Sequence, residues 1–146
     1  MDALTKSIQE AIRREKEAYD LYRLVSAATS DESRRTFIER LAVDAAGHLR
    51  IIERTCRTHS PSLATFFQHY VPEIEYADDG FAGKAGEEAL HRALESAIEH
   101  KRELHALYNT LGDAQHEAHW GAMFRELAEA EESHLNFVQE NLPAVS

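Results

Sequence analysis

The sequence predicts an all-α protein: an antiparallel four-helix bundle made of two pseudosymmetric helical hairpins joined by a long crossover. Its 146 residues contain only six Gly and three Pro, and the apolar residues recur with helical spacing rather than alternating as in strands. The segment 11–22 aligns without a gap with 97–108, and the same offset of 86 residues carries His48 onto His134. A repeat at a fixed offset indicates two copies of one supersecondary unit, which here is a pair of antiparallel helices.

The first hairpin is expected over residues 3–57. Its first helix, 3–28, ends at a polar turn in which Ser30 or Asp31 can cap the next helix, 32–57. Because the turn is short, the two helices should be antiparallel neighbours. Each helix carries one apolar stripe, formed by Leu4, Ile8, Ile12, Ala18, Tyr22 and Val25 in the first and by Ile38, Leu41, Leu49, Ile52 and Cys56 in the second.

Residues 58–86 break the helical pattern with prolines and glycines and are expected to form the crossover, with a short helix over 63–71. This segment carries too much apolar surface for a free linker, so we expect it to cover one end of the bundle or to pack on a second subunit. The apolar residues concerned are Phe66, Phe67, Tyr70, Val71, Ile74 and Phe81.

The second hairpin is expected over residues 87–142. Its helices should span 87–111 and 114–141, because Gly112 ends the first of them and Pro143 ends the second. Both helices repeat the apolar stripe of the first hairpin, so the two hairpins should bury these faces against each other.

Composition limits the possible functions. A chain of this length is expected to form a single domain, residues 1–146. The formal net charge of −10 disfavours nucleic acid and anionic membrane surfaces as partners. Cys56 is the only cysteine, so neither a disulfide nor a cysteine-rich zinc or iron site is expected. No segment has the pattern of a targeting signal or a membrane span, and we expect a cytoplasmic protein.

Charged residues interrupt the apolar stripes at matching levels of the four helices. Glu15 and Ala45 are equally far from the first hairpin turn, and Lys101 and Glu131 are equally far from the second. At 1.5 Å per residue each distance is about 22 Å, so pseudo-twofold packing would bring these levels together at the middle of the bundle. Buried charges persist only when they are paired or bind a metal. The residues expected to face one another are Glu15, His48, Lys101, Glu131 and His134.

Glu131 and His134 form the Glu-x-x-His unit that carboxylate-bridged metal sites use. Together with Glu15 on the first helix and His48 on the second, this pattern resembles rubrerythrin and the wider ferritin-like di-iron superfamily. The first helix of that family reads roughly Ala-Ile-x-x-Glu-x-x-Ala-x-x-x-Tyr. The matching residues here are Ala11, Ile12, Glu15, Ala18 and Tyr22. The resemblance covers both hairpins, while the rubredoxin-like iron domain of full rubrerythrins is absent from this sequence.

The resemblance implies a ferritin-like bundle whose ligands come from all four helices. Carried over by position, the metal-ligand candidates are Glu15, His48, Glu131 and His134. Two carboxylates of the family pattern are missing, because Ala45 and Lys101 stand where the second and third helices should each supply a Glu. Asp44, one position away, could replace the missing Glu only if its helix rotated or locally rewound.

These departures change the charge balance of the site. Glu15 and Glu131 sum to −2, and the Lys101 ammonium brings the total to −1 with neutral histidines. We therefore expect a core ion pair in which Lys101 replaces metal charge beside Glu15 and Glu131. One proton shared by His48 or His134 would complete neutrality.

Three functions are compatible with this pattern. The leading hypothesis is a rubrerythrin-like bundle with a degenerate di-metal site and no cofactor, which acts as a binding or structural module and forms a homodimer. One alternative is a mononuclear or di-iron oxidoreductase or peroxidase, which as an enzyme would be a non-haem iron oxidoreductase of rubrerythrin type. The other is a metal carrier that uses iron, Mn or Zn at the surviving ligands. No catalytic residue is assigned. Tyr22 and Tyr108 resemble the family's buried tyrosines near ligand carboxylates, although ordinary core tyrosines show the same spacing.

Overall fold

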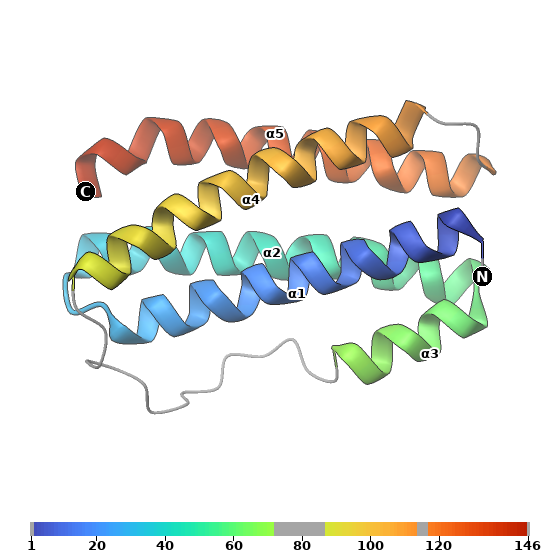
Figure 1. The fold of residues 1–146 in the computed structure, drawn as a ribbon, viewed down its shortest axis with the longest axis horizontal. Coiled ribbons are helices and arrows are strands. Elements are labelled where there is room, and N and C mark those ends of the chain that lie inside the picture. The colour runs from blue at the N-terminus through green and yellow to red at the C-terminus, as the bar shows by residue number, and fades with distance from the viewer. Residues whose placement is uncertain (1, 72–86, 114–116, 146) are drawn as a thin grey trace.

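The computed structural model describes residues 2–71, 87–113 and 117–145, and within these ranges every regular element is a helix (Figure 1). The predicted all-α class is therefore confirmed. The helices are α1 (Ala3–Ala28), α2 (Glu32–His59), α3 (Pro61–Tyr70), α4 (Glu87–Asp113) and α5 (Ala118–Val145).

Short polar side chains set the starts of the first three helices. Asp2 and Asp31 each accept a hydrogen bond from the backbone N–H three residues further on, at 2.7 and 3.0 Å. Of the two capping candidates in the first turn, Asp31 rather than Ser30 caps α2. Ser60 ends α2 and also caps α3, whose first residue is Pro61. Proline suits this position because the first N–H groups of a helix have no partner within the helix.

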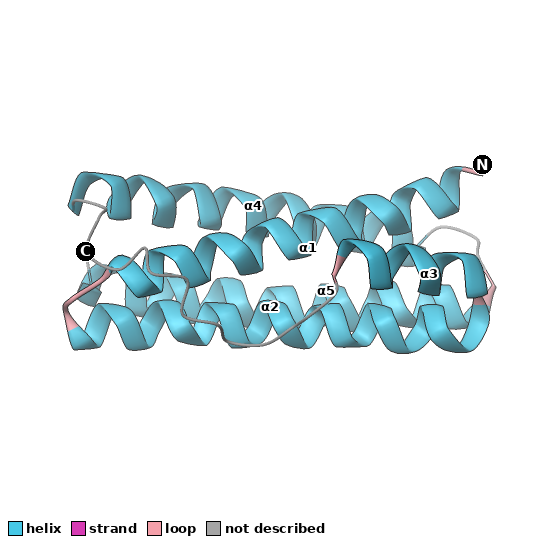
Figure 2. Cartoon of the chain, turned by 90° about the horizontal axis from the view of Figure 1, so that it is seen from below, coloured by secondary structure: helices cyan, strands magenta, loops and turns pink. Residues whose placement is uncertain are grey.

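The long helices pack as two antiparallel pairs, α1 with α2 and α4 with α5 (Figure 1). The pairs are joined by contacts of α2 with α5 and of α1 with α4. The short helix α3 lies against α1 and α2 (Figure 2). Among the residues whose burial is described, this arrangement buries the apolar stripes of α1, α2 and α5 and, in α4, Leu104 and Tyr108. The pseudo-twofold relation between the pairs stays a prediction.

Several helix boundaries differ from the sequence-based expectation. Helix α2 runs to His59, and α4 runs through Gly112 to Asp113. Glycine weakens a helix but does not end it when the neighbouring turns are packed. Helix α5 runs through Pro143 to Val145. A proline so close to the end of the helix removes only one backbone hydrogen bond.

Other expectations fall partly outside the described residues. The short helix expected over 63–71 is α3, and the rest of the predicted crossover, 72–86, lies outside the described part. This part includes Ile74 and Phe81. Helix α5 begins at Ala118, and residues 114–116 of the expected fourth helix are also outside the description.

The core is apolar along most of its length. Its largest fully buried side chains include Tyr19, Tyr108, Phe67, Phe124 and Met123. In the described part of the chain, no helix is long and apolar enough to cross a membrane. Against this apolar background, a group of buried charges at the middle of the bundle stands out.

Candidate functional site

The four long helices each contribute to one buried polar cluster, which we call the central cluster. Helices α1, α2 and α4 supply one residue each, and α5 supplies two. Each of these residues is at most 5% exposed. The members of the central cluster are Glu15, His48, Lys101, Glu131 and His134.

His48 lies between the two buried carboxylates. Its Nδ1 atom is 2.9 Å from Oε1 of Glu131 and 3.3 Å from Oε2 of Glu15. Burial alone would lower the pKa of His48, but the carboxylates of Glu15 and Glu131 outweigh it and raise that pKa to about 10. His48 is therefore an imidazolium at neutral pH, and its charge is shared between two carboxylates.

Lys101 is the second cation of the central cluster. Its Nζ atom is 2.6 Å from Nδ1 of His134 and 3.8 Å from Oε1 of Glu131. The same ammonium lies 5.6 Å from the centre of the Tyr22 ring, where the electron-rich face of the ring favours a cation. Of the two carboxylates expected to pair with Lys101, Glu131 lies within reach.

His134 connects the central cluster to the edge of the bundle. Since the Lys101 ammonium can only donate, Nδ1 of His134 is the acceptor, and Nε2 carries the hydrogen that bonds to Oδ2 of Asp44. Burial and the nearby cations Lys101 and His48 lower the pKa of His134 despite the opposing effect of Asp44. His134 is thus a neutral imidazole at pH 7.

Asp44 is half-buried and joins His134 to a surface arginine. Its carboxylate is 3.2 Å from Nε of Arg40, whose side chain is exposed. Burial would raise the pKa of Asp44, but the hydrogen bond from His134 and the charge of Arg40 hold it below the ordinary value. The Asp44 carboxylate is therefore ionised and has its own counterion at the surface.

Two tyrosines border the central cluster and differ in their bonding. The Tyr108 hydroxyl donates to Oε1 of Glu15 at 2.8 Å. Burial and the charge of Glu15 raise the pKa of Tyr108 well above 10, so the hydroxyl keeps its proton. The Tyr22 hydroxyl and Oε2 of Glu131 are buried and have no hydrogen-bond partner among the described residues.

Together these contacts form one chain of hydrogen bonds and ion pairs across the bundle. Two buried carboxylates face two buried cations, and the outer carboxylate faces an arginine, so the charges balance with protein groups alone. In order, the chain runs through Tyr108, Glu15, His48, Glu131, Lys101, His134, Asp44 and Arg40.

A protein-family model described as Rubrerythrin matches residues 6–142, which include most of each long helix and the whole central cluster. The chain belongs to the rubrerythrin family. No curated protein and no solved structure matched the chain in the corresponding comparisons. Family membership confirms the resemblance drawn from the sequence and agrees with a ferritin-like helical bundle.

The residues of the central cluster do not fit the two-iron centre that the rubrerythrin family implies. Ala45 is buried at the level where α2 should supply a carboxylate, and its methyl group cannot bind a metal ion. Lys101 brings a positive charge to the level where α4 should supply a negative one. His48, Glu131 and His134 do hold potential ligand atoms within 4.8 Å of one another. Nδ1 of His48, Oε1 of Glu131 and both ring nitrogens of His134 already contact neighbouring charged groups, whereas Oε2 of Glu131 has no hydrogen-bond partner among the described residues.

Two connections of the central cluster do not follow from the sequence pattern. Asp44, which the family pattern presents only as a displaced candidate for the missing carboxylate, accepts a hydrogen bond from Nε2 of His134. The spacing of Arg40 and Asp44, one helical turn apart, is the signal in the sequence that this carboxylate is held in place. Spacing alone is compatible with either a core or a site role for Tyr108, and its bond to Glu15 places it at the site.

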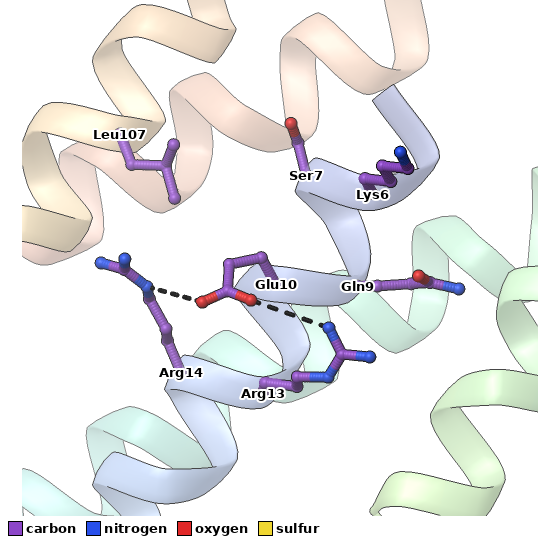
Figure 3. Close-up of a pocket in the computed structure, with 7 residues that line it drawn as sticks. All are labelled: Lys6, Ser7, Gln9, Glu10, Arg13, Arg14 and Leu107. Atoms are coloured by element: carbon purple, nitrogen blue, oxygen red, sulfur yellow. Dashed lines mark hydrogen bonds and ion pairs between the residues drawn. The ribbon is translucent and has the colours of Figure 1, made fainter. Parts of the chain in front are cut away.

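A separate hollow of about 540 Å³ lies on the outer side of α1, beside Leu107 of α4 (Figure 3). No residue of the central cluster lines it. Glu10 pairs with two of the cations that line it, because its carboxylate lies 3.7 Å from Arg13 and 3.1 Å from Arg14.

Proposed function

We propose that this protein is a rubrerythrin-family bundle with a degenerate di-metal site, in which a network of ion pairs takes the place of the metals, and that it acts as a binding or structural module. The observation that carries the proposal is the Lys101 ammonium inside the ligand cluster, 2.6 Å from Nδ1 of His134. This cation neutralises charge that a metal ion would otherwise neutralise.

The energetics of metal uptake support the proposal. A divalent ion at this position would have to displace Lys101 from His134 and to remove the proton that His48 shares with Glu15 and Glu131. The displaced ammonium would lose its hydrogen bond to His134, and a hydrogen bond that involves a charged group typically contributes about 1.5–3 kcal/mol. Binding of two ions would also lack the bridging carboxylates that balance their charge.

One observation favours a second candidate, a single metal ion bound as in a metal carrier or a mononuclear oxidoreductase or peroxidase. Oε2 of Glu131 is buried and has no hydrogen-bond partner among the described residues. This oxygen, with His48 and His134, could bind iron, Mn or Zn if Lys101 moved away. Glu15 would be the fourth ligand of that site.

Metal analysis of two matched proteins tests the proposal. Tag-free wild-type protein and the double variant Ala45→Glu with Lys101→Glu are incubated anaerobically with ferrous iron and desalted. The iron bound per chain is then measured by inductively coupled plasma mass spectrometry. The proposal predicts no stoichiometric iron in the wild type and uptake in the variant, which regains four carboxylates. Iron bound stoichiometrically by the wild type would contradict the degenerate-site function.

The double variant needs its own control, because Ala45 is buried and a glutamate is larger. Circular dichroism shows whether the variant keeps the helical content of the wild type. A well-folded variant that takes up no metal would mean that the site has changed in shape as well as in charge, and that the family's ligand roles do not transfer to these positions.

The proposal also includes a homodimer in the cytoplasm. Among the described residues, Leu24 and Val43 are the large apolar side chains that remain exposed. Phe66 and Tyr70 of the predicted crossover are only partly buried against the bundle. The proposal is that a second copy covers this partly exposed apolar surface. The single cysteine, which cannot form a disulfide within the chain, is in keeping with a reducing compartment.

A further inference from the structure

Two histidines stack where the end of α2 meets the beginning of α5. His59 is the last residue of α2, and His119 lies in the first turn of α5. Their ring centres are 3.6 Å apart, and the ring planes are inclined by only 10°. His59 is exposed and the His119 side chain is 24% exposed, so solvent reaches this pair directly.

A carboxylate adjoins the histidine pair. Oε2 of Glu117 lies 3.3 Å from Nε2 of His119, and the Glu117 side chain is 78% exposed. Two imidazoles and one carboxylate are a ligand set that binds Zn²⁺ and its neighbours Ni²⁺ and Cu²⁺, with water completing the coordination.

We propose that His59, His119 and Glu117 form a surface site for a divalent transition metal of the zinc class, separate from the central cluster. The site would join the C-terminal end of α2 to the N-terminal end of α5. The proposal does not depend on the state of the central cluster, because it shares no residue with it.

One shared ion requires the stacked rings to rearrange. Two nitrogens bound at about 2.0–2.1 Å to a tetrahedral ion are about 3.3 Å apart, and their ring centres would then lie about 5 Å apart, further than the present 3.6 Å. The parallel rings must therefore separate and tilt so that one lone pair of each points to the same place. His59 can turn because it is exposed at a helix end, and the exposed Glu117 can turn with it.

Trp120 makes the proposed site measurable. It is the only tryptophan of the chain, and its ring centre lies 5.0 Å from that of His119 and 6.3 Å from that of His59. A Ni²⁺ ion held by the histidines would therefore be close enough to quench its fluorescence. Zn²⁺ has a filled d shell and should compete for the site without quenching.

The experiment is a titration of the full-length, tag-free protein with Ni²⁺, followed by the emission of Trp120. We expect saturable quenching at micromolar Ni²⁺, which a chelator reverses and Zn²⁺ prevents. His59→Asn should weaken the apparent affinity at least about tenfold, since even outer-shell partners of a metal ligand contribute 10–100-fold. His69→Asn is the matched control, because His69 is an exposed histidine on α3 and should leave the titration unchanged.

A second variant and a second signal keep the test decisive. His119→Gln should abolish quenching, and Zn²⁺ should raise the Tm of the wild type but not of either site variant, because a ligand that binds only the folded protein stabilises it. If His119→Gln loses helical content, its result does not count, and the test rests on His59→Asn, which changes an exposed residue. Absence of quenching in the wild type, or equal quenching in wild type and His59→Asn, would overturn the proposal.

Discussion

Lys101 donates a hydrogen bond from Nζ to Nδ1 of His134 at 2.6 Å, so the lone pair of a family ligand position is directed at an ammonium group. The contact joins the two helices of the second hairpin, α4 and α5. It explains how a bundle that keeps Glu15, His48, Glu131 and His134 can bury them with balanced charge. The stability of the fold should therefore depend on Lys101.

Lys101→Met should destabilise the fold by about 3–5 kcal/mol, because it leaves Glu131 without one of its two cations in a buried site. Urea denaturation followed by circular dichroism measures the free energy of unfolding. Arg102→Met is the matched control: it removes one positive charge from the adjacent exposed position and should change that free energy by no more than about 0.5 kcal/mol. Equal effects of the two variants would show that Lys101 does not hold the cluster together.

The loss of the hydroxyl from Tyr108 and from Tyr22 should affect the free energy of unfolding differently. Tyr108→Phe removes a hydrogen bond to the Glu15 carboxylate and should cost about 1.5–3 kcal/mol. Tyr22→Phe removes a hydroxyl that has no partner among the described residues and should be nearly neutral or stabilising. The positions correspond in the internal repeat, and both rings are buried, so each controls for the loss of a hydroxyl in the other. A larger loss for Tyr22→Phe in urea unfolding would contradict the assigned bonding.

Stability should fall between pH 7 and 9 because of His48. Its pKa rises from 6.5 to about 10 on folding, so its contribution is fully present below pH 6.5 and is lost as the pH rises through 10. One proton contributes a slope of at most about 1.4 kcal/mol per pH unit to the free energy of unfolding. His48→Gln should flatten this slope. Urea denaturation at several pH values measures it, and parallel pH profiles of wild type and variant would mean that His48 is not protonated in the folded protein.

The sequence predicted the helices and most of the central cluster because both depend on local periodicity. A stripe with a spacing of 3.6 residues determines which face of each helix is buried, and equal distances from the turns place Glu15, Lys101 and Glu131 at one level. The role of Asp44 could not be predicted in this way. It lies at the edge of the stripe, and its bond to His134 depends on how closely α5 approaches α2. The stack of His59 on His119 likewise depends on packing between distant segments.

The proposed homodimer is tested by its mass. Sedimentation velocity at micromolar protein concentration should give the mass of a homodimer, because Phe66 and Tyr70 of α3 are apolar and only partly buried, so that a second copy can cover them. The same measurement at several concentrations separates a stable dimer from weak association. A monomeric mass throughout would rule out the dimer and leave the crossover as a cover for its own bundle.

A crystal structure of the wild-type protein grown with excess ferrous iron, with data collected at the iron absorption edge, tests the central claim most directly. The account predicts no anomalous peak among His48, Glu131 and His134, and the Nζ atom of Lys101 still bonded to Nδ1 of His134. An iron peak at that position with Lys101 turned away would contradict the account and would make the protein a metal-binding member of its family.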